Sequence, residues 1–382
     1  MNQIYLDYNA STPIDPRVAA VMRPLLDGPY ANPSATHAGG RAARAIVEEA
    51  RAQVAALLGA APDEVVFTSG GSEANNLALK GAWFALRNRG DHIVTTSVEH
   101  PAIVEPARFL ERLGARVTFV AVDRTGRVDP DDVRRAITSR TIIVSVMHAN
   151  NEVGTIEPIA EIAAIARERG VLMHTDAAQS VGKIPTRVDD LGVDLLSIAG
   201  HKLYAPKGIG ALYIRRGVHL EPLIHGAGHE SGRRAGTESA LLAAALGAAC
   251  ELAADLEPMA ETRRLRDVFW ELLRARLGDR VVLNGHPQER LPNTLNLSVV
   301  GQVGADILAS LEGVAASTGS ACHSGSVDLS PVLQAMGVPP GEGMGALRFS
   351  LGRGTTEAEI REVAERLVAA AETMPAVPVP NA

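Results

Sequence analysis

Short apolar runs alternate with longer amphipathic stretches from about residue 60 to residue 216. In the longer stretches apolar side chains recur at helical spacing, whereas the short runs are rich in β-branched residues, which is typical of buried strands. We expect strands at residues 64–69, 92–98, 116–122, 141–148, 171–176, 194–199 and 210–215. We expect helices between them at residues 73–88, 101–113, 130–137 and 158–169. This alternation predicts βαβ units and a mainly parallel sheet.

The pattern changes on both sides of that region. Residues 40–58 form an amphipathic helical pattern, and residues 238–276 are predicted to form one continuous helix. Further on, strands at 281–284, 294–299 and 347–351 mix with helices at 305–312 and from 356 onward, as in an α+β unit. We predict a domain boundary near residue 257, with residues 14–257 forming a large domain and residues 1–13 and 258–382 a small one. The tail at 375–380 is expected to be extended.

Composition narrows the class of protein. The 382 residues carry a net charge of -7 and a pI near 5.9, which argues against a nucleic-acid or membrane-surface binder. No apolar stretch approaches the length of a membrane span, and the N-terminus lacks the basic start and apolar core of a signal peptide. Two cysteines in so long a chain favour a reducing compartment, so we expect a cytoplasmic protein.

Two candidate catalytic side chains stand at the ends of predicted strands. Asp176 ends the run at 171–176, and Lys202 follows the run at 194–199. In an α/β sheet, binding and catalytic residues usually lie just past the carboxyl ends of the strands. A lysine that forms an imine and a carboxylate that holds a pyridinium proton are what pyridoxal 5'-phosphate (PLP) requires. Either residue alone would be read as an ordinary surface charge.

A glycine pair marks a candidate phosphate seat. Residues 67–76 run from a strand through Gly70 and Gly71 into a helix. Glycines let the backbone approach an anion, and the first amides of a helix attract one. Gly71 and Ser72 would lie nearest the phosphate. The alternative is that Ser72 simply caps the helix.

Three more polar residues follow predicted strands. The ring of His100 would lie over a flat cofactor, although a lone loop histidine is more often merely solvated. The amide of Asn151 suits a phenolate or a carboxylate, but Asn-Asn is also common in turns. Gln179 lies three residues beyond Asp176. Reading His174 and Asp176 as metal ligands has no further cluster to support it, so we expect no metal.

Cys322 and Arg348 belong to the second predicted domain. Cys322 lies among Ser, Thr, Gly and Ala at 317–325, which suits a mobile nucleophile, although most free cysteines are small buried residues. Cys250, in an alanine-rich helix, is expected to be structural. The guanidinium of Arg348 suits the carboxylate of a substrate or, equally well, a salt bridge on the polar face of a strand.

Together these segments resemble the cysteine desulfurases of the NifS/IscS type, in the class-V aminotransferase family. The resemblance is carried by YLDYNASTP (5–13), NPSATH (32–37), TSGGSEANN (68–76), EH (99–100), NNEVG (150–154), HTDAAQ (174–179), GHKLY (200–204), RAGT (234–237), GSAC (319–322) and LRFSLGR (347–353). It implies PLP fold type I, the aspartate-aminotransferase-like α/β fold. A large PLP-binding domain with a mainly parallel seven-stranded sheet is then joined by a smaller α+β domain.

The resemblance implies a role for each matching position around the cofactor ring. Lys202 would carry PLP covalently, Asp176 would pair with the pyridine nitrogen, and His100 would stack on the ring. Gln179 and Asn151 would contact the oxygen side of the ring.

The phosphate would be held by Ser72 and His201, with Thr237 contributed by the partner subunit of a homodimer. Two positions depart from the family pattern. Ala199 stands where a hydroxyl residue is frequent, and Ser72 stands where threonine is usual.

On the substrate side, Cys322 would take the sulfur, Arg348 would bind the carboxylate, and Asn32 would lie close by. The implied reaction converts L-cysteine to L-alanine and leaves a persulfide on Cys322 for an acceptor protein, such as an iron–sulfur scaffold or a thiolation enzyme. A segment at about 315–328 would carry the persulfide to that acceptor. His323 replaces a frequent threonine and would help to deprotonate the thiol or to select the partner.

Three other functions remain open. A PLP-dependent lyase acting on selenocysteine or on a cysteine-sulfoxide conjugate would make Cys322 less essential. A cysteine hydrolase using Cys322 and His323 would leave Lys202 unexplained. A catalytically silent scaffold for sulfur transfer would have no need of Lys202, Asp176 and Cys322 together.

Overall fold

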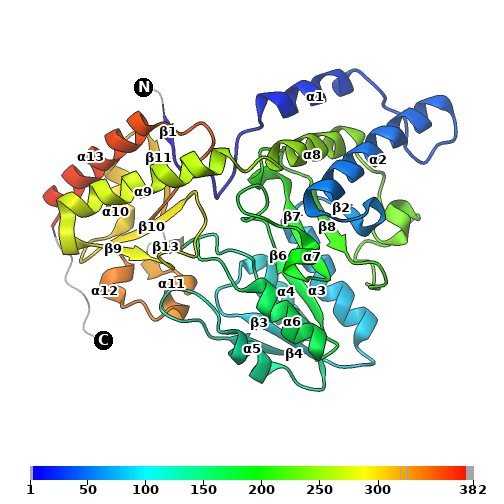
Figure 1. Cartoon of the computed structure of the whole chain (residues 1–382), viewed down its shortest axis with the longest axis horizontal. Helices are drawn as coiled ribbons and strands as arrows, with labels where there is room; N and C mark the ends of the chain where they lie inside the picture. Colours follow the sequence, from blue (N-terminus) through cyan, green and yellow to red (C-terminus); the bar gives the residue numbers. More distant parts are fainter. Residues whose placement is uncertain (1–2, 319, 324–325, 376–382) are drawn as a thin grey trace.

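The computed structural model of the chain describes residues 3–318, 320–323 and 326–375 (Figure 1). For residues 320–323 and 326–328 it describes the main chain. The expected tail lies outside these residues from 376 onward. Two sheets organise the chain, the larger to the right and the smaller to the left in Figure 1. No helix in the described part is both long enough and apolar enough to cross a membrane.

The larger sheet has seven strands in the order β2-β8-β7-β6-β5-β3-β4. These are β2 (Val65–Thr68), β3 (His92–Thr96), β4 (Arg116–Val120), β5 (Thr141–Ser145), β6 (Leu172–Asp176), β7 (Leu195–Ala199) and β8 (Gly210–Ile214). Only β8 runs antiparallel to its neighbours in this sheet. The expected seven-stranded, mainly parallel sheet is therefore confirmed.

Helices cover both faces of this sheet, which is why its strands are apolar runs rather than alternating ones. One face carries α3 (Gly71–Leu86) and α4 (Pro101–Glu111), and the other carries α2 (Ala38–Leu58), α5 (Pro130–Ala136), α6 (Ile159–Glu168), α7 (Val188–Leu191) and α8 (Ala240–Ala253), with α1 (Pro16–Leu26) packed on α8. Neighbouring residues of one strand belong to different cores: Ile143 belongs to the core that contains Leu77 and Ile103, whereas Val144 belongs to the core that contains Val54 and Leu246.

The expected continuous helix over residues 238–276 is wrong. The structure has two helices, α8 and α9 (Pro258–Leu277), separated by residues 254–257. Pro258 has no N–H to donate and occupies the first turn of α9, where that donor is not needed. Proline therefore begins α9, at the position of the predicted domain boundary, and α8 has already ended at Ala253.

The smaller sheet is antiparallel, in the order β12-β15-β10-β9. Its strands are β12 (Ser317–Thr318), β15 (Ala346–Ser350), β10 (Thr294–Val299) and β9 (Val281–Asn284). It packs against α9 and α13 (Glu357–Thr373), where Phe269 and Phe349 meet edge to face with ring centroids 5.0 Å apart. The other elements here are α10 (Gly304–Ser310), α11 (Pro331–Ala335), α12 (Pro340–Gly343) and the hairpin β13 (Ser320–His323) with β14 (Ser326–Leu329).

The N-terminal segment joins this smaller unit. β1 (Ile4–Tyr5) pairs in parallel with β11 (Val314–Ala315), and Ile4 and Leu6 are buried in the same core as Phe269. On this basis we propose the division predicted above, with residues 1–13 and 258–382 in the small domain and residues 14–257 in the large one.

Candidate active site

A cavity of about 570 Å³ opens where the carboxyl ends of the parallel strands face the small unit. The segments after β2, β3, β5, β6 and β7 line it, together with the N-terminal segment and β15. It gathers most of the predicted site residues: Gly71, Ser72, His100, Asn151, Asp176, Gln179, His201, Lys202 and Arg348. The strand-end positions thus converge as parallel topology requires.

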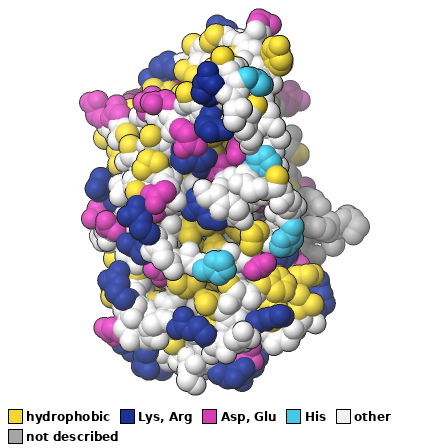
Figure 2. Space-filling model, turned by 90° about the vertical axis from the view of Figure 1, so that its right-hand side faces the viewer, with side chains coloured by type: hydrophobic (Ala, Val, Ile, Leu, Met, Phe, Trp, Pro, Cys, Tyr) yellow, Lys and Arg dark blue, Asp and Glu magenta, His cyan; other side chains and the backbone are white. Residues whose placement is uncertain are grey.

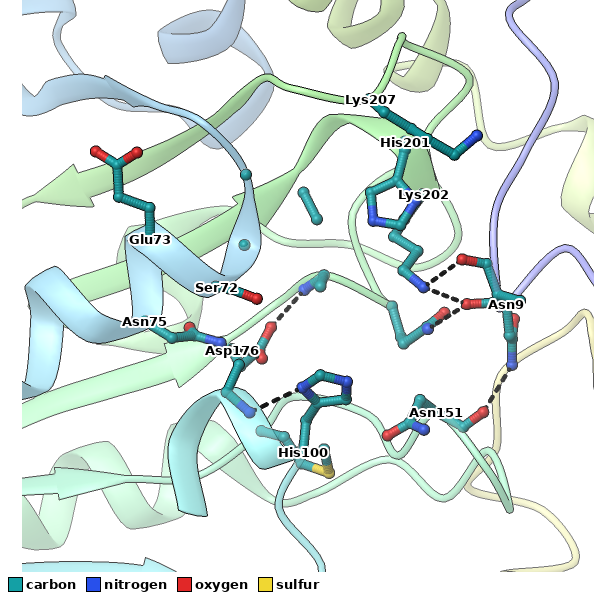
Figure 3. Close-up of a pocket in the computed structure, with 18 of the residues that line it drawn as sticks. Asn9, Ser72, Glu73, Asn75, His100, Asn151, Asp176, His201, Lys202 and Lys207 are labelled. Carbon is teal, nitrogen blue, oxygen red and sulfur yellow. Dashed lines mark hydrogen bonds between the residues drawn. The ribbon is translucent and has the colours of Figure 1, made fainter. Parts of the chain in front are cut away.

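Lys202 reaches into this cavity from a single 3₁₀ turn after β7. Its Nζ donates to the main-chain carbonyl oxygens of Asn9 at 2.5 Å and Ala10 at 2.8 Å (Figure 3). Burial and then the charge of Arg348 lower the pKa of this amine to about 8, although Asp7 and Asp176 raise it. A larger fraction of Lys202 is therefore the neutral, nucleophilic amine than of an ordinary lysine.

Asp176 is held by two donors on the sheet side of the cavity. Its Oδ2 accepts from Nδ2 of Asn75 at 2.6 Å, and its Oδ1 accepts from the N–H of Ala178 at 2.9 Å (Figure 3). Asn75 sits in the second turn of α3 and was missed by sequence reasoning, which stopped at the first turn of that helix. His174 has both ring nitrogens bonded to the hydroxyls of Ser145 and Ser197, so it is not turned toward a metal.

His100 lies across the cavity, at the N-cap of α4 (Figure 3). Its Nδ1 accepts from the N–H of Ala102 at 3.0 Å, so the neutral ring carries its proton on Nε2. Burial lowers the pKa of this imidazole, Asp176 raises it and Lys202 lowers it. Neutral His100 therefore presents a flat face and one N–H to the site.

The N-terminus of α3 forms an anion seat at one end of the cavity. No side chain caps this helix: Gly70 stands at the N-cap, and the hydroxyl of Ser72 lies on the cavity wall. A Cβ at Gly210 would lie 2.7 Å from the Cα of Gly70, so β8 can approach this loop only with glycine there. Burial, with Lys202 and Lys207, lowers the pKa of His201 to about 4. Lys207 lines the same end and was not predicted.

Gln179 and Asn151 lie near the N-terminal segment. Nε2 of Gln179 donates to the carbonyl oxygen of Asn9 at 3.0 Å, and its Oε1 accepts from Nζ of Lys183 at 2.9 Å. The carbonyl oxygen of Asn151 accepts from Nδ2 of Asn9 at 3.2 Å and from Nη1 of Arg348 at 3.0 Å. Asn9 stands within the motif at 5–13 but was given no role, because the sequence does not show which distant segments its side chain and carbonyl meet.

The position of Arg348 is compatible with both roles expected from the sequence, binding of a substrate's carboxylate and a salt bridge. It lines the cavity, and its Nη2 also forms an ion pair with Oδ1 of Asp7 at 2.8 Å and a hydrogen bond with Oγ of Ser317 at 2.9 Å. Its Nε is buried and has no hydrogen-bond partner among the residues the structure describes.

Two predicted residues do not line this cavity, and a third has a side chain that the structure does not describe. Asn32 lies in a turn where its Oδ1 accepts from the N–H of Ser34, and neither Asn32 nor Thr237 lines the cavity of this chain. The main chain of Cys322 lies in β13 opposite Val327, and its side chain is outside what the structure describes. Their roles stay predictions.

The residues present fit PLP. The cavity volume lies within the range of roughly 300–1,000 Å³ that is typical of small-molecule sites. An uncapped helix N-terminus suits the phosphate, and His100 and Asp176 flank a space that a planar ring would fill. Lys202 projects its amine into the same space.

Comparisons with known proteins agree with this geometry. The model of the family described as aminotransferase class V matches residues 4–363. The cysteine desulfurase IscS of Dictyoglomus turgidum is 49% identical, over 96% of this chain and 94% of its own length. A solved structure of a NifS-like protein superimposes with a TM-score of 0.91 at 35% identity, covering 97% of this chain and all of that one.

A second solved structure, of SspA in complex with cysteine, has a TM-score of 0.82 at 36% identity and covers 92% of this chain and all of that one. The likeness therefore extends from β1 to α13, through both sheets and the cavity between them. The chain belongs to the class-V aminotransferase family, whose members depend on PLP, and within that family to the cysteine desulfurases.

Proposed function

We propose that the protein removes the sulfur of L-cysteine with PLP held at Lys202, releases L-alanine and keeps the sulfur as a persulfide on Cys322. The observation that carries this is the meeting of Lys202 and Asp176 in one cavity that ends at the uncapped N-terminus of α3. The relatives named cysteine desulfurase and the neighbour solved with cysteine support it.

PLP, when bound, supplies an electron sink for bond cleavage next to the substrate's α-carbon. The chain supplies the groups around it. The carbonyl oxygens of Asn9 and Ala10 hold Nζ of Lys202, which moves the proton of the substrate's α-carbon. Asn75 and the N–H of Ala178 keep the Asp176 carboxylate turned toward the ring position.

His100 and Arg348 orient the substrate in this proposal. The ring of His100 covers one face of the site with its Nε2–H directed inward. The guanidinium of Arg348 binds the substrate's carboxylate. The carbonyl oxygen of Asn151 holds its Nη1 and the hydroxyl of Ser317 holds its Nη2, which fixes the guanidinium at the cavity edge. Asn32 contacts the substrate in the assembled enzyme.

Cys322 then takes the sulfur. Its thiolate attacks the substrate's sulfur, so a new S–S bond forms while the C–S bond of cysteine breaks and a proton is returned to the carbon. The balance is one thiol plus L-cysteine giving one persulfide plus L-alanine, with no external oxidant.

The assembled enzyme is a cytoplasmic homodimer in this proposal. Thr237 of each subunit completes the phosphate seat of the other, which is why it does not line the cavity of its own chain. The persulfide passes to an acceptor protein, with an iron–sulfur scaffold or a thiolation enzyme as the candidate classes.

The test compares matched variants of the two cysteines and of Lys202. Borohydride reduction of the PLP-loaded protein should leave the cofactor's mass on the peptide that contains Lys202, and Lys202→Ala should lose it. Cys322→Ala should keep that mass but form no alanine from L-cysteine. Cys250→Ala is the control, because burial raises the pKa of the Cys250 thiol to about 12 and keeps it unreactive.

One outcome would overturn the persulfide step: alanine formed from L-cysteine at the wild-type rate by Cys322→Ala. If that variant instead turned over selenocysteine at the wild-type rate and cysteine not at all, the assignment would move to a selenocysteine lyase.

A further inference from the structure

Lys183 is a buried lysine that the reaction described above does not use. It is 8% exposed, and no ion pair joins it to a carboxylate in the part of the chain that the structure describes. Its Nζ donates to Oε1 of Gln179 at 2.9 Å. Burial, then Lys202 and Arg348, lower its pKa to about 7. An ammonium group buried without an anionic partner is costly, so its presence here calls for a reason.

The choice of lysine at this position is itself informative. The chain has 37 lysines and arginines, and only four of them are lysines: Lys80, Lys183, Lys202 and Lys207. Arginine thus provides almost every basic side chain. On the face shown in Figure 2, basic side chains lie interspersed with acidic ones. Lys202 and Lys207 line the cavity, Lys183 lies behind it, and Lys80 stacks on Phe109. Three of the four lysines therefore cluster at the site, where a compact amine serves and a forked guanidinium would not.

Lys183 determines which way the Gln179 amide points. The ammonium form of Lys183 has three donors and no acceptor, and the neutral amine keeps two N–H donors, so Lys183 donates to the oxygen of Gln179 in either form. Nε2 of Gln179 then faces the opposite side, where the carbonyl oxygen of Asn9 can only accept. The amide is thus oriented by an amine that donates at one end and by a carbonyl that can only accept at the other.

The same carbonyl connects Gln179 to Lys202. The oxygen of Asn9 accepts from Nε2 of Gln179 at 3.0 Å and from Nζ of Lys202 at 2.5 Å (Figure 3). Lys183, Lys202 and Asn293 also wall a small internal space between the two domains, where Asn293 bonds the side-chain oxygen of Asn9. A continuous series of contacts therefore runs from Lys183 to the amine at the centre of the site.

We propose that Lys183 is a positioning residue: it orients the Gln179 amide and, through the carbonyl of Asn9, fixes the place of Nζ of Lys202. This rests on the proposed attachment of PLP at Lys202. Without Lys183, the buried Oε1 of Gln179 has no donor, and the amide turns away from Asn9 to find one. The amine of Lys202, and the cofactor bound to it, are then no longer held in their proper positions.

A double-mutant cycle tests this directly. Lys183→Met keeps the length of the side chain and removes the donor, Gln179→Leu removes the amide, and the third protein carries both changes. Apoprotein of each is titrated with PLP, and both the affinity and the wavelength of the bound cofactor's absorption band are recorded. We expect Lys183→Met to weaken PLP binding by about five- to tenfold, the value of one lost hydrogen bond.

Because Lys183 acts through Gln179 in this proposal, the double variant should bind PLP no more weakly than Gln179→Leu and should show the same band. Multiplicative losses in the double variant would overturn the proposal, as would a Lys183→Met protein with wild-type affinity and band. A lysine that only filled space would give multiplicative losses or none.

Two further variants complete the design. Lys80→Met removes a lysine outside the site and should leave affinity and band unchanged. Lys183→Gln keeps an amide N–H that can donate to Gln179, so this variant is expected to bind PLP more tightly than Lys183→Met. If the Lys183→Met protein does not fold, Lys183→Gln takes its place in the cycle. The wild-type protein distinguishes failure of the proposed function from failure of the role of Lys183. If borohydride reduction leaves no cofactor on Lys202 of the wild-type protein, the proposed function is refuted. If the wild-type protein loads normally but the losses in the cycle are additive in free energy, only the role of Lys183 is refuted.

Discussion

Nη2 of Arg348 lies 2.8 Å from Oδ1 of Asp7, a residue 341 positions away in the sequence. Oγ of Ser317 donates to the same carboxylate oxygen at 2.8 Å. The guanidinium that we propose for the substrate's carboxylate is thus already bonded to a carboxylate of its own chain. A substrate must share Arg348 with Asp7 or displace it.

Asp7→Asn should therefore lower the KM for L-cysteine. Asparagine keeps an oxygen for Arg348 and Ser317 but removes the negative charge that competes with the substrate, an effect of about 1 kcal/mol or roughly fivefold in KM. Steady-state kinetics of alanine formation measures it. In an Arg348→Met background the same change should have no effect on KM. An unchanged or higher KM for Asp7→Asn alone would show that Asp7 does not compete.

Asn75→Leu should lower kcat by roughly ten- to a hundredfold, because Asp176 loses the donor that holds its Oδ2 and a lost bond to a charged group costs about 1.5–3 kcal/mol. Alanine formation at saturating cysteine is the measurement. Asn76→Ala is the matched control, since that exposed amide bonds only the main chain of its own helix. Equal kcat values for the two variants would rule out a role for Asn75.

The strands and the strand-end residues could be predicted from the sequence. The inner strands of the large sheet are buried on both faces, so they appear as largely apolar runs, and residues such as Asp176 and Lys202 then fall at their carboxyl ends by topology. The prediction of one helix over 238–276 was wrong because the helical periodicity on the two sides of Pro258 was taken as one pattern. Proline is favoured at the first position of a helix, so Pro258 marks the start of a second helix.

The supporting residues could not be predicted, because their roles depend on contacts between distant segments. Asn75 meets Asp176 across 101 positions and Asn9 meets Lys202 across 193. Neither residue type nor local spacing marks these pairs. Asp7 is similar: nothing adjacent to it in the sequence points to Arg348.

PLP attachment to the apoprotein should speed up as the pH rises through about 8. The neutral amine is the nucleophile, and burial together with Arg348 brings the pKa of Lys202 down from 10.5 to about 8, so the neutral fraction reaches its plateau above that pH. Stopped-flow absorbance over a pH series measures the midpoint. Arg348→Met should move the midpoint upward, because it removes the second cause of the shift. A midpoint near that of an ordinary lysine would contradict the buried setting of this amine.

Glu99→Gln should weaken the fall in stability of the protein above neutral pH. Glu99 is buried beside the site; its Oε1 accepts from Oγ1 of Thr96 and the N–H of Met147, and burial raises its pKa from 4.5 to about 8. The folded protein therefore holds a proton on Glu99 that the unfolded chain releases above pH 4.5. Stability falls as pH rises between those two values and levels off above about 8.

The histidines give the opposite sign in a different window. Burial lowers the pKa of His148 from 6.5 to about 4, so its contribution to stability is lost as pH falls below 6.5. Lys183 and Lys202, with pKa values lowered by burial to about 7 and about 8, make stability rise with pH in the same range. Urea unfolding between pH 7 and 8 therefore reports Glu99 through the difference in slope between the wild-type protein and the variant. Each pKa unit of separation corresponds to about 1.4 kcal/mol, so wild-type protein should lose on the order of 1 kcal/mol per pH unit from Glu99. Glu157 has a pKa raised to about 8 by burial and by Glu99, so Glu99→Gln should remove about half of the downward slope that these two carboxyl groups contribute, and Glu99→Gln with Glu157→Gln should remove the rest. A single variant with the wild-type slope would show that Glu99 is ionised in the folded protein.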